Sequence, residues 1–204
     1  MRLLLVRHGQ TPSNVARRLD TAVPGDDLTD EGHVQARALV SALAPLTLDA
    51  LYVSALVRTH QTAAPLAADR GLTPVIRPGL REIQAGDDEM TPDPARWEAY
   101  LGIIYRWLDG DLEARVPGGE TGAEVLARYD AVVAEVAAAH PDSTAVLVSH
   151  GAVIRAWTGL RATNIDRGFV ADSRLGNTAV VVLERSPQDG WRVVTWADTE
   201  PPGI

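Results

Sequence analysis

Short apolar runs, each ending in a polar turn, recur along this chain and predict buried strands. Such runs, apolar on both faces, are typical of the parallel sheets of α/β proteins. The last two runs are joined by the turn residues 185–190, which predicts a hairpin and therefore one antiparallel strand. The six runs are residues 3–6, 50–53, 73–77, 144–149, 178–183 and 191–196.

Between these runs, apolar residues recur at the 3.6-residue spacing of amphipathic helices. Thr29 is a candidate N-cap for a helix that Pro45 ends. Thr121 and Glu124 have the spacing of a capping box, which predicts the start of a long helix. The buried face of the first helix is predicted at Val34, Ala38, Leu39, Ala42 and Leu43, and that of the second at Val125, Tyr129, Val132, Val133 and Val136.

The alternation of strands and helices predicts the α/β class. We expect a doubly wound, mostly parallel central sheet of about six strands with one antiparallel strand and helices on both faces. A chain of 204 residues suits one domain, so we expect a single domain over residues 1–204.

Residues 87–116 differ from the rest of the chain in composition. Tyr100, Ile103, Ile104 and Trp107 recur at helical spacing between acidic and proline-rich flanks, which predicts a helical lid inserted into the domain. The alternative is that these side chains anchor the helix on the core.

Composition excludes several chemistries. The chain has no cysteine, which excludes disulfides, thiolate metal sites and a cysteine nucleophile. All 19 basic residues are arginine, and the absence of lysine excludes a Walker A motif and Schiff-base catalysis.

The net charge of −8 argues against nucleic-acid binding, while small anionic substrates remain compatible with it. The sequence contains neither a long apolar run nor a signal segment, so we expect a cytoplasmic protein that does not bind membranes. A homodimer through a sheet edge or the lid is compatible with the sequence, which does not specify an oligomeric state.

Two of the predicted strands deliver a histidine to a loop. Arg7, His8 and Gly9 follow the first run, and His150 and Gly151 follow the run at 144–149. Ligands of open α/β sheets bind at the carboxyl ends of strands, and arginine beside histidine suggests phosphate chemistry. Taken alone, the first tripeptide is equally compatible with a capping arginine and a hydrogen-bonded loop histidine.

Other polar residues are weaker candidates. His33 and His60 lie in predicted helices and His140 near a helix end, where solvated or capping roles are expected. The pair Asp109 and Asp111 resembles the start of an aspartyl phosphatase motif, but it does not follow a strand. The cluster Asp87, Asp88 and Glu89 suggests either a metal site or, by default, a solvated acidic loop.

A series of motifs, taken in order, resembles one family. They are Arg7 to Thr11 with Asn14, Leu28-Thr29 to Gly32 with Gln35-Ala36, Ser54, Arg58-Thr59, Gln61 to Ala63, Glu82, Pro117 to Thr121, and Ser149 to Gly151. The chain is thereby similar to the histidine phosphatase superfamily, which includes phosphoglycerate mutases and related phosphatases. It also resembles a subgroup common among actinobacterial members.

The resemblance implies a metal-independent phosphomonoesterase that needs no cofactor, takes a small phosphorylated metabolite and releases inorganic phosphate. It makes His8 the nucleophile, which carries a phosphohistidine intermediate, and Glu82 the group that protonates the leaving oxygen and then activates water. His150 would take part in catalysis and in phosphate binding. The remaining phosphate-binding residues would be Arg7, Asn14, Arg58 and Gly151.

Physical chemistry agrees separately with this assignment. Phosphoryl transfer needs positive charge on the nonbridging oxygens, which arginines and an imidazolium at His150 can supply in place of a metal. The attacking imidazole of His8 must be neutral, and flanking arginines disfavour its protonated form. We expect its other ring nitrogen to donate to a backbone carbonyl.

Departures from the family pattern favour a phosphatase over a mutase. Ala85 stands where mutases use a tyrosine, and Arg106 and Arg115 stand apart where mutases have adjacent lid arginines that clamp a carboxylate. The alternatives are a phosphoglycerate mutase and a non-catalytic module that binds a phosphorylated ligand.

Overall fold

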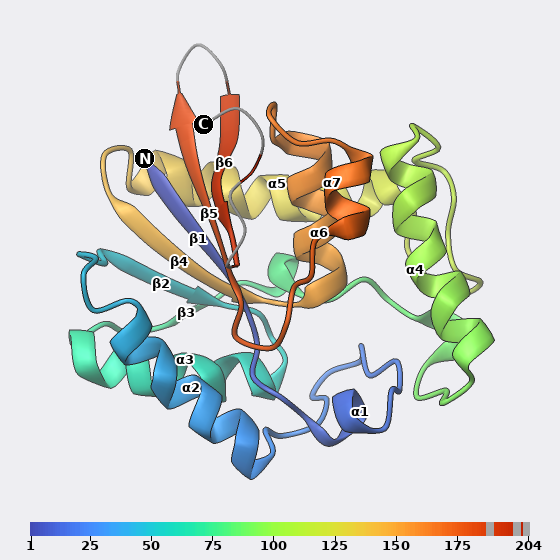
Figure 1. Cartoon of the computed structure of the whole chain (residues 1–204), viewed down its shortest axis with the longest axis horizontal. Coiled ribbons are helices and arrows are strands. Elements are labelled where there is room, and N and C mark those ends of the chain that lie inside the picture. Colours follow the sequence, from blue (N-terminus) through green and yellow to red (C-terminus); the bar gives the residue numbers. More distant parts are fainter. Residues whose placement is uncertain (187–189, 198–200, 202–204) are drawn as a thin grey trace.

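The apolar runs pair into one six-stranded sheet in the computed structural model of the protein, which describes residues 1–186, 190–197 and 201 (Figure 1). Strands β1, β4, β2 and β3 pair in parallel, whereas β5 runs antiparallel to both β1 and β6. The predicted mostly parallel sheet with one antiparallel strand is therefore confirmed. In sheet order the strands are β3 (Val75–Ile76), β2 (Ala50–Val53), β4 (Thr144–Ser149), β1 (Arg2–Arg7), β5 (Val180–Ser186) and β6 (Gly190–Trp196).

Two of these strands differ in extent from their predictions. The third strand forms only at Val75–Ile76, and both of its residues are exposed at the edge of the sheet. Part of the predicted hairpin turn, residues 187–189, lies outside the described residues. The antiparallel pairing of β5 with β6 nevertheless confirms the hairpin.

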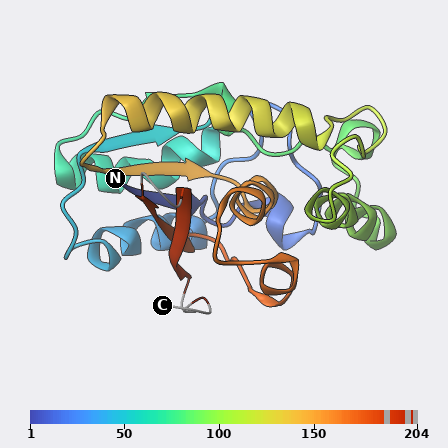
Figure 2. The ribbon, with the colours of Figure 1, turned by 90° about the horizontal axis from the view of Figure 1, so that it is seen from above.

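The central strands are buried on both faces because alternate side chains enter two separate cores. From β1, Leu3 and Leu5 join the larger core, whereas Leu4 and Val6 join the smaller one. Helices α2 (Asp30–Ala42) and α3 (Val57–Arg70) cover the smaller core, and α5 (Gly122–Ala139) and α6 (Gly151–Arg161) cover the larger one. Figure 1 shows these two sets of helices on opposite sides of the strands, and Figure 2 shows α5 running along the sheet.

Helix α2 buries a different face from the predicted one. Thr29 caps it as expected, but the buried residues of the helix are Gly32, Ala36 and Leu39, with Leu43 just beyond its end. The helix N-terminus packs against the loop after β1, where a Cβ on Gly32 would lie 2.2 Å from the carbonyl oxygen of Gln10. This close approach fixes the rotation of the helix. Three residues of the predicted face are exposed as a result: Val34, Ala38 and Ala42.

The segment predicted as a lid contains the short 3₁₀ helix η2 (Gly86–Asp88) and helix α4 (Pro94–Leu108). Tyr100, Ile104 and Trp107 are buried in the larger core, and the Tyr100 hydroxyl donates to the carbonyl of Ile83 at 2.8 Å. The alternative that these side chains anchor the helix is therefore confirmed for all three. Trp97, one turn earlier, is 38% exposed.

The remaining helices are short. Sequence periodicity did not predict α7 (Arg167–Asp172), because a six-residue helix with a single buried residue, Val170, shows no repeat. The others are α1 (Pro12–Val15) and the 3₁₀ helix η1 (Pro78–Leu80). Among the described residues, no helix combines the length and apolar character needed to span a membrane.

Candidate active site

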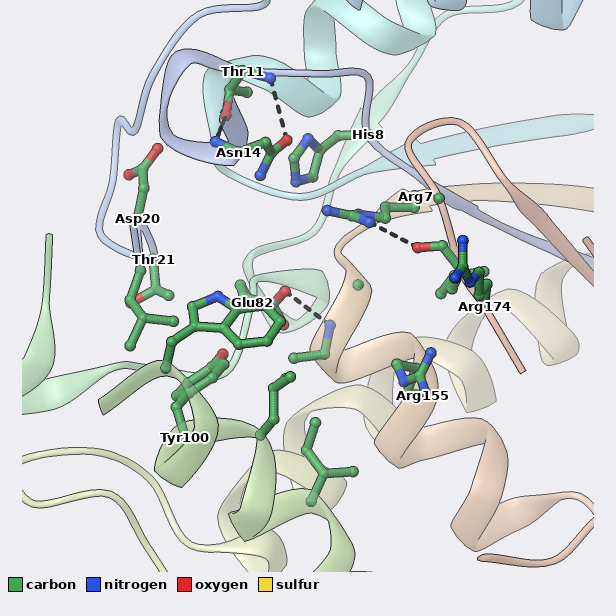
Figure 3. A pocket seen from close by; sticks show the side chains of 18 of the residues that line it. Arg7, His8, Thr11, Asn14, Asp20, Thr21, Glu82, Tyr100, Arg155 and Arg174 are labelled. Atoms are coloured by element: carbon green, nitrogen blue, oxygen red, sulfur yellow. Dashed lines mark hydrogen bonds between the residues drawn. The ribbon is translucent and has the colours of Figure 1, made fainter. Parts of the chain in front are cut away.

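The carboxyl ends of β1, β2 and β4 meet at one edge of the sheet, where they place His8, Ser54 and His150 next to one another. A cavity of about 540 Å³ opens at this edge (Figure 3). This volume is in the range of sites for small metabolites. The predicted site residues Arg7, His8, Asn14, Arg58, Glu82 and Gly151 line it.

His8 is held as a neutral imidazole with one defined tautomer. Its side chain is buried, and Nδ1 lies 2.7 Å from the carbonyl oxygen of Gly9. Since a carbonyl only accepts, Nδ1 carries the proton and Nε2 keeps a free lone pair. Burial, and then the charges of Arg58 and Arg7, hold the pKa of His8 well below its usual value. Both the predicted carbonyl bond and the predicted effect of the arginines are confirmed.

Asn177, which the sequence did not single out, fixes the loop that carries His8. Its Nδ2 donates to the carbonyl of His8 at 3.0 Å and to Oδ1 of Asn14 at 2.9 Å. Oδ1 of Asn14 also accepts from the backbone of Thr11 at 3.2 Å. With its oxygen occupied in this way, Asn14 has Nδ2 left to donate into the cavity. Asn177 lies 169 residues from His8 in the chain, so no local pattern could have revealed the contact.

Two arginines flank His8. Arg7 donates from Nη1 to the carbonyl of Leu175 at 2.7 Å. Arg58 forms a buried ion pair with Asp20 at 3.1 Å and also donates to the Asp20 carbonyl at 2.8 Å. Gly25 makes room for this pair, since it has a φ of +72° and a Cβ there would lie 2.4 Å from Nη1 of Arg58.

His150 is hydrogen-bonded through the other ring nitrogen from the one that His8 uses. Its Nε2 lies 2.7 Å from Oγ of Ser54, and within the described residues its buried Nδ1 has no partner. The rings of His8 and His150 lie 5.2 Å apart, centroid to centroid. Burial, and then the charge of Arg58, lower the pKa of His150 well below its usual value. Both effects disfavour the imidazolium expected at His150, because the residue is fully enclosed and lies close to arginines.

Three buried side-chain nitrogen atoms around His8 have no hydrogen-bond partner within the described part of the chain. They are Nε of Arg7, Nε of Arg58 and Nδ1 of His150. A buried donor without an acceptor costs about 1–3 kcal/mol, so a group of them indicates a ligand that brings several acceptor oxygens. A phosphoryl group has this chemistry. Gly151 lies beside Arg7, and a Cβ at this position would lie 3.1 Å from Nε of Arg7. The absence of a side chain at Gly151 therefore leaves room next to this nitrogen.

Glu82 faces the same cavity from the segment after η1 (Figure 3). Its Oε1 accepts from the backbone N–H groups of Ile83 at 3.0 Å and Val153 at 2.8 Å. Its Oε2 accepts from Ala152 at 3.0 Å and from no other group of the described residues, so it keeps a lone pair for a proton. The carboxyl group is thus fixed at the start of α6, next to His150.

Arg128 of α5 holds the segment that carries Glu82. It donates to the carbonyls of Gly79 and Arg81, each at 2.8 Å, and to that of Glu82 at 3.1 Å. Glu120 accepts from Arg128 at 2.8 Å and completes this support. Glu120 belongs to the motif Pro117 to Thr121 noted in the sequence, whereas Arg128 was not singled out there.

The acidic segment after Glu82 is structural. Glu89 accepts from the backbone of Thr21 at 2.7 Å and of Ala22 at 3.0 Å, and Asp88 pairs with Arg96 at 3.2 Å. The default of a solvated acidic loop is therefore wrong for these two residues, whereas Asp87 is exposed. No group of three histidine, aspartate or glutamate side chains in the described ranges is arranged to hold a metal ion.

The remaining candidates lie away from the cavity. His60 bonds the carbonyl of Ser54 at 2.8 Å, and His140, at the end of α5, bonds the Tyr52 hydroxyl at 3.0 Å. Asp109 pairs with Arg167 at 3.0 Å.

Comparison with known proteins places this geometry in a family. The model of the histidine phosphatase superfamily (branch 1) matches residues 3–199. The structure of a mycobacterial glucosyl-3-phosphoglycerate phosphatase has a TM-score of 0.79 and 29% sequence identity, and the alignment covers 97% of this chain and 99% of that one.

Two relatives extend the comparison. A protein of Enterobacter sp. (strain 638) that carries the name phosphoglycerate mutase GpmB is 31% identical over 74% of this chain and 70% of its own length. The PE-PGRS family protein PE_PGRS11 of Mycobacterium tuberculosis is 37% identical over 94% of this chain. This chain spans only 35% of the length of that second relative.

Proposed function

The chain belongs to the histidine phosphatase superfamily (branch 1), and from this premise we propose that it is a metal-independent phosphomonoesterase that hydrolyses a small phosphorylated metabolite. His8 would carry the phosphoryl group as a phosphohistidine. The observation that carries the proposal is the neutral imidazole of His8, with a free Nε2, surrounded by buried nitrogen atoms that have no hydrogen-bond partner among the described residues.

In the first step, Nε2 of His8 attacks phosphorus while the bond from phosphorus to the ester oxygen breaks. Nε of Arg7, Nε of Arg58 and Nδ1 of His150 would donate to the nonbridging oxygens, and these charge-assisted bonds are strongest when charge has accumulated there. Glu82 would supply the proton that the leaving oxygen takes, from Oε2.

In the second step, water attacks the phosphohistidine. Glu82, now a carboxylate, would accept a proton from the water while the oxygen of that water bonds to phosphorus. The bond from phosphorus to Nε2 breaks, its electron pair returns to the ring, and inorganic phosphate leaves. The enzyme then returns to its starting state, with a neutral His8 and a protonated Glu82.

A phosphoglycerate mutase is the second candidate, and the relative that carries the name GpmB favours it. A mutase must hold the dephosphorylated acid in place while it keeps water from the phosphohistidine. The departures from the mutase pattern at Ala85, Arg106 and Arg115 favour hydrolysis instead. A non-catalytic binding module is the third candidate, and the arrangement of Glu82 opposite a free Nε2 argues against it.

Turnover of a chromogenic phosphoester, with and without a chelator, tests the proposal. We expect hydrolysis that the chelator leaves unchanged. An assay with 3-phosphoglycerate and a bisphosphoglycerate primer separates hydrolysis from mutase activity, because only a mutase yields the isomeric monophosphate. Binding of phosphate without turnover of any phosphoester would leave only the binding module.

The role of Glu82 has a sharper signature than loss of activity. We expect Glu82→Gln to lower kcat by about 10²- to 10⁴-fold for alkyl phosphates, whose leaving oxygen needs a proton. The loss in the first step should be much smaller for 4-nitrophenyl phosphate, because nitrophenolate leaves without one. Burst kinetics measure that step directly. Equal losses with both substrates would contradict the role of acid.

A further inference from the structure

The cavity extends beyond the three unpartnered donors, and part of its wall carries arginines that the proposed reaction does not use. Arg155 projects from α6, and Arg174 from the segment after α7. Figure 3 shows both on the side of the cavity where Arg7 lies, with Tyr100 of α4 across from them. We refer to Arg155 and Arg174 as the arginine wall.

Arg155 is fixed in position, but its charge is not neutralised. Nη1 donates to the carbonyl of Ser173 at 2.8 Å and Nη2 to that of Val170 at 2.5 Å. Both acceptors are neutral. Burial is the largest cause of the lowered pKa of Arg7, and the charge of Arg155 lowers that pKa further. The two guanidinium groups are therefore close enough to repel one another.

Arg174 has a fixed backbone and a free side chain. Its carbonyl accepts from Nε1 of Trp196 at 3.0 Å, and its neighbour Leu175 holds Arg7. Within the described residues, its exposed guanidinium has neither an ion-pair nor a hydrogen-bond partner. The side chain is thus anchored at the rim of the cavity with all its donors available.

Most of the arginines that line the cavity form no ion pair within the described residues. Elsewhere in these residues ion pairs are frequent, and ten arginines form one, among them Arg58 with Asp20. Of the five arginines that line the cavity, only Arg58 does so within the described part of the chain. A chain with a net charge of −8 has carboxylates to spare, so the cavity has positive charge that its own acids do not neutralise.

We propose that the arginine wall binds a second anionic group of the substrate, either a carboxylate or a further phosphate. The preferred substrate is then a phosphomonoester with an acidic group at its other end. The guanidinium of Arg174 can bind such a group through two parallel hydrogen bonds, and Arg155 adds charge behind it. This inference rests on the proposed function only in placing the phosphoryl group at His8.

The opposite side of the cavity suits the body of such a molecule. Tyr100, Leu101 and Ile104 of α4 line it with carbon-rich surface. Arg106 and Arg115, which stand apart and do not form a carboxylate clamp, lie in α4 and in the segment after it. The structure instead brings Arg155 and Arg174 together from two other elements.

Phosphonates test the inference without catalysis, because their P–C bond is not cleaved. The probes are an alkyl phosphonate, the same chain ending in a carboxylate, and the same chain ending in a second phosphonate, in a series of lengths. Hydrogen bonds between charged groups lead us to expect binding about 10- to 100-fold tighter for one of the dianionic probes at the best length. Titration calorimetry measures all three.

Variants test whether the arginine wall causes the tighter binding of the dianionic phosphonates. Arg174→Gln should remove most of it and change the affinity for the alkyl phosphonate less than about twofold, since a single anion does not reach Arg174. Arg174→Lys should retain part of it. The matched control is Arg37→Gln, an exposed arginine of α2 on the other face of the sheet, which should bind all probes as the wild type does.

The results distinguish a carboxylate from a second phosphate as the bound group, and they test the further inference separately from the proposed function. Preference for the carboxylate or for the second phosphonate identifies the group. Equal binding of all three probes by the wild type, or a preference that survives Arg174→Gln, overturns the inference. Arg155 is part-buried, so Arg155→Gln can fail to fold. The test therefore depends on Arg174→Gln, at an exposed position. A preference without phosphoester turnover would refute the proposed function alone, and turnover without a preference would refute this inference alone.

Discussion

The two strand-end histidines look alike in the sequence, but the structure holds them in opposite ways. His8 has Nδ1 tied to its own neighbour, Gly9, and presents Nε2 as a lone pair. His150 has Nε2 tied to Ser54, from another strand, and presents Nδ1, which lacks an acceptor. Under the proposed mechanism, one ring would attack phosphorus and the other would donate to oxygen. The hydrogen-bond partner of each ring, and not the residue type, would then set its role.

Removal of His8 should have the largest effect on this arrangement. We expect His8→Ala to lower turnover by about 10⁴-fold or more, because the variant lacks the proposed nucleophile. Acid-labile labelling by a phosphate donor should also disappear. His33→Ala, which removes a half-buried helical histidine, is the control and should keep both. A labelled His8→Ala protein would refute the assignment of the nucleophile.

Removal of His150 should slow the reaction without abolishing it. His150→Ala deletes one donor to the transferred group, and the loss of such a donor lowers kcat by about 10²- to 10³-fold. His8 should still become labelled, although more slowly. Rapid-quench labelling measures the rate. If His150→Ala abolished the label as fully as His8→Ala, the two histidines would not have the separate roles inferred here.

Removal of Ser54 tests the tautomer itself. Ser54→Ala deletes the bond to Nε2 of His150, and one hydrogen bond of this type is worth about 1–1.5 kcal/mol, or about tenfold in rate. The ring nitrogen signals of His150 in NMR spectra should change, whereas those of His8 should not. Ser41→Ala, at an exposed position of α2, is the control. Loss of activity with an unchanged His150 signal would point to a role for Ser54 other than holding the ring.

The smallest effect concerns stability. The pKa values of both histidines lie below those of the unfolded chain, so the unfolded state takes up protons that the folded state does not as pH falls below about 6.5. We expect the free energy of unfolding to fall by up to about 1.4 kcal/mol per pH unit for each histidine between pH 6.5 and 5.

Urea denaturation of the wild type, His8→Asn and His150→Asn across this range measures the slope. Each variant should show a shallower dependence on pH. An unchanged slope in both variants would mean that neither histidine is kept neutral by the fold.

The sequence by itself determined the secondary structure that positions the site. Apolar runs predicted the six strands, and Thr29 and the pair Thr121 and Glu124 predicted two helix starts that the structure confirms. These signals act within a few residues, since strand burial and helix capping depend on near neighbours. The placement of His8 and His150 at strand ends follows from the same signals. The family resemblance added Arg58 and Glu82, and the structure brings both to the same cavity.

Tertiary structure alone decided how these residues are partnered. The bond between Ser54 and His150 joins residues 96 positions apart, and that between Asn177 and His8 joins residues 169 apart. The rotation of α2 and the position of Arg174 at the cavity likewise depend on which surfaces meet. Hydrogen-bond and ion-pair partners are selected by packing between distant segments. A local pattern can therefore predict that a histidine reaches the site, but not which of its nitrogens is free there.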